Sequence, residues 1–250
     1  MDLALAAFVV APGLALGSFL NVVAARVPLR RSVVRPPSAC MACAQELRWY
    51  DNIPLVSYAL LRGRCRHCGV RIHWVYPAVE LVTAALLAGC VLAFGVTAEA
   101  AVAAFFCTVL VAVSAIDLEH RIIPNRIVLP ATAVVLVANT LRDPSVEWIV
   151  AGLAASGFLF AAALAYPAGM GMGDVKLALL MGAALGKLVA VAMMVGMLAA
   201  LVPGIYLMAR HGQAARKMGI PFAPFLAIGS IVALFAGDFL LSWYLGILGA

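Results

Sequence analysis

Two aspartates stand where long apolar stretches of the chain meet short polar segments. Asp117 closes an apolar run in AIDLEHRIIPN, and Asp174 opens another in GMGMGDVKLALLMGAALG. Ionisable side chains close to the hydrocarbon of a membrane are costly and usually mark a functional interior. Each aspartate alone is also explained as a charge at a helix end, since the N-terminus of a helix stabilises an anion.

As a pair, the two carboxylates suit the hydrolysis of a peptide bond. Carboxylates that share a site separate their pKa values, so that one stays protonated while the other is ionised. The ionised group can take a proton from water as general base, while the protonated group polarises the scissile carbonyl and later donates to the leaving amine. The pattern therefore predicts a water-activating dyad of Asp117 and Asp174.

Three glycines directly precede the second aspartate, at positions 169, 171 and 173. Glycine lets another backbone approach closely and permits turns that other residues resist. We therefore expect Gly169, Gly171 and Gly173 to form an active-site loop next to Asp174.

Four cysteines form two CxxC pairs separated by 21 residues, namely Cys40, Cys43, Cys65 and Cys68. Two such pairs can supply four thiolates to a tetrahedral ion, and this spacing is close to a recognised zinc pattern. A site with four protein ligands is closed, so the ion would be structural. Disulfides and a redox-active CxxC pair remain alternatives, although a reducing compartment disfavours the former.

The composition identifies the elements that must position these residues. Hydrophobic residues make up 66% of the 250 residues and charged residues 11%, whereas about a quarter of a soluble domain is charged. A membrane-spanning helix needs about 20 apolar residues. Eight segments come near this length, at about 3–25, 75–95, 100–116, 127–141, 148–166, 175–187, 188–209 and 222–248. We expect an all-α, multi-pass membrane protein, with the first segment retained because it lacks the basic flank of a signal peptide.

The basic residues predict the orientation, because cytoplasmic loops are enriched in lysine and arginine. With eight crossings, all of the 17 basic residues except Arg142 and Lys187 fall on one side, nine of them in the loop at 26–74. This places both termini outside the cytoplasm and both aspartates at the cytoplasmic face. Topology and attraction to anionic membrane lipid explain the net charge of +6, so no nucleic-acid partner is needed.

Three parts follow from this reading: a first transmembrane helix at 1–25, a cytoplasmic zinc-binding loop domain at 26–74 and a seven-helix membrane core at 75–250. Glu80 lies early in the second helix, where an unpaired charge is expensive. We expect it to pair with an arginine of the loop or to face the catalytic interior.

Several motifs together resemble one family, the type IV prepilin peptidases, also called leader peptidase/N-methyltransferases. In order along the chain they are GSFLNVVAARVP, the CxxC pairs around WYDNIPLVSYALLRGRC, RIHWVYPAVELVT, IDLEHRIIPN, GMGMGDVKLALLMGAALG and IPFAPFLAIGSI. The match runs from about residue 17 to 231, and GMGMGD resembles the GxGD signature of intramembrane aspartyl proteases.

The resemblance implies a bifunctional enzyme of the bacterial inner membrane. Its expected activity is cleavage of type IV prepilins and type II secretion pseudopilins after a glycine, followed by N-methylation of the new N-terminus from S-adenosylmethionine. Asp117 and Asp174 carry over as the catalytic pair, and the four cysteines match members with the full cytoplasmic loop. Glu80 and Gly63 are further candidates for support of substrate binding or methyl transfer.

Two alternatives remain open. In a proton-coupled transporter, Asp117 and Asp174 would carry protons, and glycine-broken helices suit transporters too. Both carboxylates fall at one interface, however, and no internal repeat is evident. A prepilin peptidase without methyltransferase activity is the second alternative, because the sequence contains no local S-adenosylmethionine motif and methyl transfer rests on the resemblance.

Overall fold

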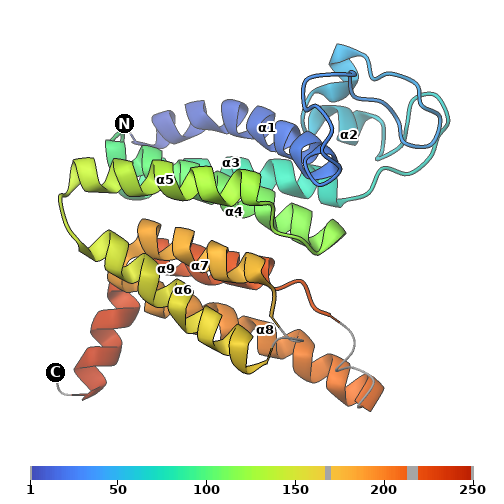
Figure 1. Ribbon diagram of the computed structural model, residues 1–250. Coiled ribbons are helices and arrows are strands. Elements are labelled where there is room, and N and C mark those ends of the chain that lie inside the picture. The colour runs from blue at the N-terminus through green and yellow to red at the C-terminus, as the bar shows by residue number, and fades with distance from the viewer. Residues whose placement is uncertain (1, 167–169, 213–218, 249–250) are drawn as a thin grey trace. The chain divides into compact units, whose positions relative to one another are not determined.

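The computed structural model describes residues 2–166, 170–212 and 219–248, and within these ranges the chain is helical, without strands (Figure 1). Eight helices of 14 residues or more occur there: α1 (Asp2–Arg26), α3 (Val75–Phe94), α4 (Ala98–His120), α5 (Asn125–Arg142), α6 (Glu147–Ala165), α7 (Met172–Leu185), α8 (Val189–His211) and α9 (Ala223–Leu248). Three short helical pieces accompany them: η1 (Trp49–Asn52), α2 (Val56–Leu60) and η2 (Gly186–Leu188). The predicted all-α fold is confirmed.

Six segments of the described chain are long and apolar enough to cross a membrane, as expected for a multi-pass protein. One of them is the 40-residue stretch Met172–His211, in which α7, η2 and α8 follow one another directly, with the exposed Lys187 in η2. α5 is not among the six, because its polar residues Asn125, Arg126, Asn139 and Arg142 lower its mean hydropathy. The eight long helices match the predicted segments, whereas the number of crossings stays a prediction.

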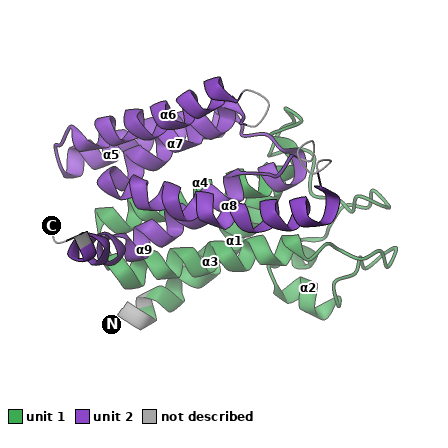
Figure 2. Cartoon of the chain, turned by 90° about the horizontal axis from the view of Figure 1, so that it is seen from below, with its two compact units in different colours: residues 1–116 green, residues 117–250 purple. Residues whose placement is uncertain are grey.

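The chain divides into two compact units, residues 1–116 and 117–250 (Figure 2). In the first unit α1 packs along α3, and the cysteine-rich loop connects these two helices. Their backbones touch at Gly17, where a Cβ would lie 2.5 Å from the Cα of Glu80. The loop between the first two long helices is therefore part of the same unit as its two anchoring helices.

In the second unit the short helix α7 is the centre of the packing. α5 and α6 both pack on α7, and α8 packs on α9. Leu177, Leu180 and Met181 are fully buried. The buried amide of Asn139 on α5 donates to the backbone oxygen of Ala183 on α7 at 2.9 Å. A helix of 14 residues is only about 21 Å long, so burial against its neighbours, rather than length, fixes its position.

Candidate active site and metal centre

Asp117 lies in the last turn of α4 and is 6% exposed. Its Oδ2 accepts a hydrogen bond of 3.0 Å from the backbone amide of Ala223, the first residue of α9. The first amides of a helix have no partner within that helix. The carboxylate of Asp117 therefore caps α9 from a different helix, and this long-range contact fixes its position.

Asp174 is the third residue of α7 and is 9% exposed. Its Oδ2 accepts the amide of Gly171 at 3.3 Å, and its own amide donates to the carbonyl of Gly171 at 3.1 Å. Asp174 and Gly171 thus form two hydrogen bonds to each other at the start of α7. Asp117 and Asp174 belong to the same unit and are close enough to interact electrostatically, so the structure brings together the two predicted acids.

The glycines before Asp174 differ in what they permit. A Cβ on Gly173 would lie 2.8 Å from the Cβ of Ile123, closer than real Cβ contacts, so only glycine fits there without displacement. Gly171 has φ −86° and ψ 148°, values open to any residue, and the nearest atom to its added Cβ is Oδ2 of Asp174 at 3.5 Å. Gly169, the third predicted member of this loop, lies outside the described residues.

A lysine near the aspartates connects the starts of two helices. Nζ of Lys176, two residues after Asp174, donates to Oδ1 of Asn125 on α5 at 2.9 Å. Sequence reasoning did not identify this pair, because the partners are 51 residues apart and neither type signals the other. The contact ties the beginning of α7 to the beginning of α5.

The four predicted cysteine ligands lie together in the loop. The Sγ atoms of Cys40, Cys43, Cys65 and Cys68 all lie within 4.8 Å of one another. The Sγ atoms of Cys40 and Cys68 are 3.8 Å apart, and two thiolates on a tetrahedral zinc are also about 3.8 Å apart when each Zn–S bond is about 2.3 Å. A disulfide needs about 2.05 Å, and all four cysteines are free. The donor set fits a tetrahedral ion.

The two CxxC segments have the same backbone conformation. The amide of Cys40 donates to the carbonyl of Gln45 at 2.9 Å, and that of Cys65 donates to Val70 at 2.9 Å. In the first segment the amide of Ala44 donates to the carbonyl of Cys40 at 2.9 Å. In the second, the amide of Gly69 donates to the carbonyl of Cys65 at 3.0 Å. We call each such turn a knuckle: residues 40–45 and 65–70.

Both knuckles use a left-handed residue directly after their second cysteine, with φ 55° at Ala44 and 70° at Gly69. Backbone amides also point at the sulfur: hydrogen bonds from the amides of Cys43 and Ala42 lower the pKa of Cys40 to about 6. The first knuckle therefore favours the thiolate form of Cys40, which is the form that a metal requires. In the second knuckle the amide of Val70 also lowers the pKa of Cys68, but burial and hydrogen bonds to the other three thiols raise it to about 11.

Glu80 and Gly63 both have partners within the first unit. Glu80, 8% exposed on α3, accepts the backbone amide of Leu55 at 2.9 Å. No arginine of the described loop lies within ion-pairing distance of it, so the expected arginine partner is replaced by a backbone amide. Gly63 has φ +65°, and a Cβ there would lie 2.9 Å from the ring of Tyr58, so this position requires glycine for conformation.

Comparison with known proteins divides the sequence into two matching regions. Residues 12–94 match the model of the Bacterial Peptidase A24 N-terminal domain, and residues 104–208 match the Type IV leader peptidase family. The first region contains the four cysteines and Glu80, and the second contains both aspartates. No solved structure gives a significant match.

Three curated relatives carry the same name, prepilin leader peptidase/N-methyltransferase. The protein of Bacillus subtilis (strain 168) is 39% identical over 241 residues, which cover 93% of this chain and 95% of the relative. That of Pseudomonas aeruginosa is 34% identical over 268 residues, covering 95% and 92%. That of Myxococcus xanthus (strain DK1622) is 43% identical over 183 residues, covering 73% of this chain and 46% of the relative. The chain belongs to the prepilin leader peptidase/N-methyltransferase family.

Proposed function

We propose that this protein cleaves type IV prepilins and type II secretion pseudopilins after a glycine at the cytoplasmic face of the bacterial inner membrane, and then methylates the new N-terminus. Two sets of observations support the activity. Residues 104–208 match the Type IV leader peptidase family, and two relatives whose names include both activities match this chain over more than nine tenths of their length. The observation that carries the mechanism is the pair of interacting, buried carboxylates, Asp117 and Asp174.

In this mechanism the two aspartates act on one water and one peptide bond. The ionised carboxylate takes a proton from the water, whose oxygen attacks the carbonyl carbon of the glycine. The protonated carboxyl donates a hydrogen bond to the carbonyl oxygen and then transfers its proton to the amine as the carbon–nitrogen bond breaks. The contacts to the amides of Ala223 and Gly171 orient the two side chains before substrate arrives.

The chemistry of the substrate supports the placement at the cytoplasmic interface. A prepilin combines a basic leader in the cytoplasm with an apolar helix in the membrane, so its scissile bond lies between the two. Asp117 closes one apolar helix and Asp174 opens another. The distribution of basic residues supports a cytoplasmic position for these two helix ends. Both chain termini are then outside the cytoplasm.

We further propose that the four cysteines hold one structural zinc ion. Cys40, Cys43, Cys65 and Cys68 would hold it, and with four protein ligands the ion cross-links the two knuckles and leaves no open position for substrate. S-adenosylmethionine, when bound, supplies the methyl group. The protein's own task in that reaction is to present the newly freed amine in its unprotonated form.

The proposal competes with a proton-coupled transporter and with a peptidase that does not methylate. The curated relatives are named as enzymes with both activities, which favours the bifunctional reading over both. The experiment is to incubate the purified, detergent-solubilised protein with a prepilin, with and without S-adenosylmethionine, and to record the N-terminus of the product by mass spectrometry. Cleavage after glycine and a gain of one methyl group are expected, and an uncut prepilin would refute the peptidase assignment.

A further inference from the structure

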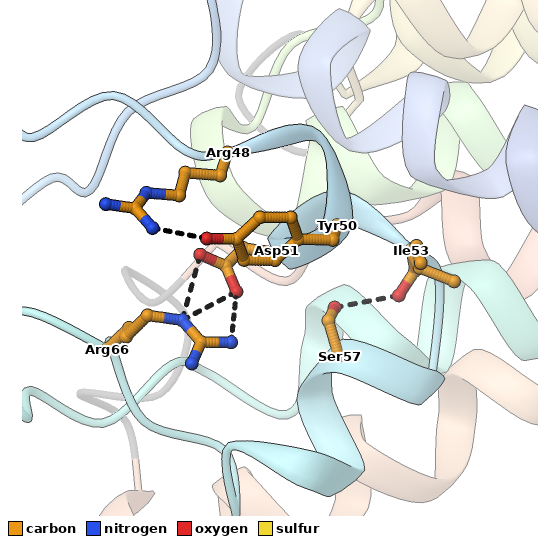
Figure 3. Close-up of polar contacts among 6 residues, drawn as sticks. All are labelled: Arg48, Tyr50, Asp51, Ile53, Ser57 and Arg66. Atoms are coloured by element: carbon orange, nitrogen blue, oxygen red, sulfur yellow. Dashed lines mark hydrogen bonds and ion pairs between the residues drawn. The ribbon is translucent and has the colours of Figure 1, made fainter.

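The segment from Asp51 to Leu55 is held at both of its ends by side chains from distant parts of the first unit. One end is bound by an arginine from the second cysteine knuckle, and the other by a glutamate from the membrane helix α3. Figure 3 shows the first of these contacts and the start of the helix that follows the segment.

Arg66 binds Asp51 through two nitrogens. Its Nη2 donates to Oδ1 at 2.6 Å, and its Nε donates to Oδ1 at 2.9 Å and to Oδ2 at 3.2 Å (Figure 3). The side chain of Asp51 is only 4% exposed, so this pair is shielded at the carboxylate. Hydrogen bonding to Asp51 raises the pKa of Arg66 above its ordinary value.

Tyr50 fills the space beside this pair. The guanidinium of Arg66 lies 5.4 Å from the centre of the Tyr50 ring, and that of Arg48 lies 5.8 Å from it. Arg48 also hydrogen-bonds the hydroxyl of Tyr50 (Figure 3). Because Arg66 lies between the ligands Cys65 and Cys68, this cluster joins the second knuckle to the start of the segment.

The other end is anchored in a membrane helix. Glu80 of α3 accepts the amide of Leu55 at 2.9 Å. Leu55 has φ 57° and ψ −44° and is the central residue of a γ-turn, in which the amide of Val56 donates to the carbonyl of Pro54 at 2.6 Å. A γ-turn with positive φ is rare and strained, and strain of about 1 kcal/mol or more at a non-glycine residue persists only where its surroundings impose it. The two anchors provide these surroundings.

We propose that Arg66 and Glu80 are positioning residues that hold the segment Asp51–Leu55 between the second cysteine knuckle and α3, and so couple the order of the knuckle to that membrane helix. α2 begins directly after this segment. The loop is then a docked element with a fixed entry into α2, and Glu80 is a structural anchor within the protein. All of these contacts lie within the first unit, and none of them involves Asp117 or Asp174.

Hydrogen exchange of the purified full-length protein, followed by mass spectrometry, tests the coupling. Glu80→Met removes the carboxylate that accepts the Leu55 amide. Insertion into the membrane should be retained, because the substitution removes an ionisable group from a membrane-spanning helix. Asp51→Asn weakens the opposite anchor. Glu46→Gln is the matched control, since it neutralises an exposed acid of the same loop.

Glu80→Met should speed exchange of the Leu55 amide by about tenfold, the effect of losing a hydrogen bond to a charged group; the peptide measured covers residues 52–61, so that this amide lies inside it. Because the proposal couples the second knuckle to α3, the amides of Cys65 and Gly69 should also exchange faster in Glu80→Met. Asp51→Asn should accelerate hydrogen exchange in the same peptide, because it weakens the anchor at the other end of the segment. In the double variant, the increase in exchange rate should be smaller than the product of the increases in the two single variants.

Two results would overturn the inference. In the first, Glu80→Met changes exchange only within α3 and leaves residues 52–61 like the Glu46→Gln control. In the second, exchange is unchanged in every variant while Glu80→Met alone reduces methylation of a cleaved peptide, which would make Glu80 a residue of the reaction. Should Glu80→Met fail to accumulate, Asp51→Asn with Arg66→Lys tests the knuckle end, with the Leu55 amide as readout.

Discussion

Asp117 and Ala223 are 106 residues apart in the sequence, yet the carboxylate of the first accepts the backbone amide of the second at 3.0 Å. The contact joins the last turn of α4 to the first residue of α9. Asp117 therefore has a structural task as well as its proposed catalytic one. A useful substitution must separate the two tasks, and asparagine does so because its side-chain oxygen can still accept the amide of Ala223.

Replacement of either aspartate by asparagine should abolish cleavage while leaving the protein in the membrane. Asn cannot act as general base or acid, so Asp117→Asn and Asp174→Asn should each lower the cleavage rate of a prepilin by about a thousandfold or more. The double variant should be no slower than either single variant, because residues that act as a unit are strongly non-additive. Rates are measured by gel shift of the prepilin under single-turnover conditions.

Asp143→Asn is the control for this series, since Asp143 is an exposed acid at the other end of α5. The Asp143→Asn variant should cleave the prepilin at the rate of the unmodified enzyme. Supplied with a peptide already cut after its glycine, the Asp117 and Asp174 variants should still transfer a methyl group. Near-normal cleavage by either variant, free of unmodified enzyme, would return that aspartate to a helix-end role.

The two described glycines of the active-site loop should respond differently to alanine. Gly173→Ala forces a Cβ to within 2.8 Å of the Cβ of Ile123, which displaces the turn that carries Asp174. A displacement of about 1 Å at a catalytic group can cost about a hundredfold in rate, so a loss of this order is expected. Gly171→Ala meets no close atom except Oδ2 of Asp174 at 3.5 Å and should keep most of the activity.

Ile123→Gly provides the rescue experiment, because it removes the Cβ that lies 2.8 Å from the added Cβ at position 173, an atom that alanine would retain. Combined with Gly173→Ala it should restore part of the lost cleavage, measured with the same prepilin assay. If Gly171→Ala proves as damaging as Gly173→Ala, steric contact with Ile123 is not the reason for glycine here.

Periodicity and composition were enough to locate the long helices, but not the contacts between them. The segment expected at 175–187 begins in the structure at Met172, because Gly171 acts as the N-cap. Asp174 thus lies inside the first turn of α7 instead of before it. A helix end depends on local capping, which an apolar run does not reveal.

The aspartates and cysteines could be chosen as candidate site residues from the sequence because their types and spacing suit the proposed chemistry. Their partners could not be found in this way. The amide of Ala223, the side chain of Ile123 and the amide of Leu55 have no side-chain chemistry that points to Asp117, Gly173 or Glu80. They are brought there only by the tertiary fold. Glu80 shows this most clearly, since its burial suggested an arginine partner or a place facing the catalytic interior, and the fold gives its carboxylate a backbone amide as donor.

Reporter fusions test the predicted orientation, in which both aspartates lie at the cytoplasmic face of the membrane. Fusions after Arg48 and Asn125 should show cytoplasmic activity, and fusions after Gly95 and Asp143 should show activity outside the cytoplasm. The reason is that arginine and lysine are retained on the cytoplasmic side during insertion. Alkaline phosphatase and a cytoplasmic fluorescent protein are suitable reporters. A cytoplasmic signal after Gly95 would contradict the order of crossings and the common location of Asp117 and Asp174.

The two knuckles allow a test of the metal site by opposite substitutions at equivalent positions. Ala44 and Gly69 occupy the same left-handed position, with φ 55° and 70°, but only the second is glycine. Ala44→Gly should remove a backbone strain of about 1 kcal/mol, whereas Gly69→Ala should introduce a similar cost, since no atom lies within 4 Å of the added Cβ to add a steric effect.

Zinc should be present at one ion per chain by elemental analysis. Its release to a chelator should become about fivefold less favourable in Ala44→Gly and about fivefold more favourable in Gly69→Ala. Cys65→Ser should lose the ion, because it removes one of the four thiolates. If the unmodified protein contains no stoichiometric metal and all four thiols are freely alkylated, the cluster is not a metal site. If the ion is present but the two glycine-position variants release it equally, the knuckle conformation does not contribute to its affinity.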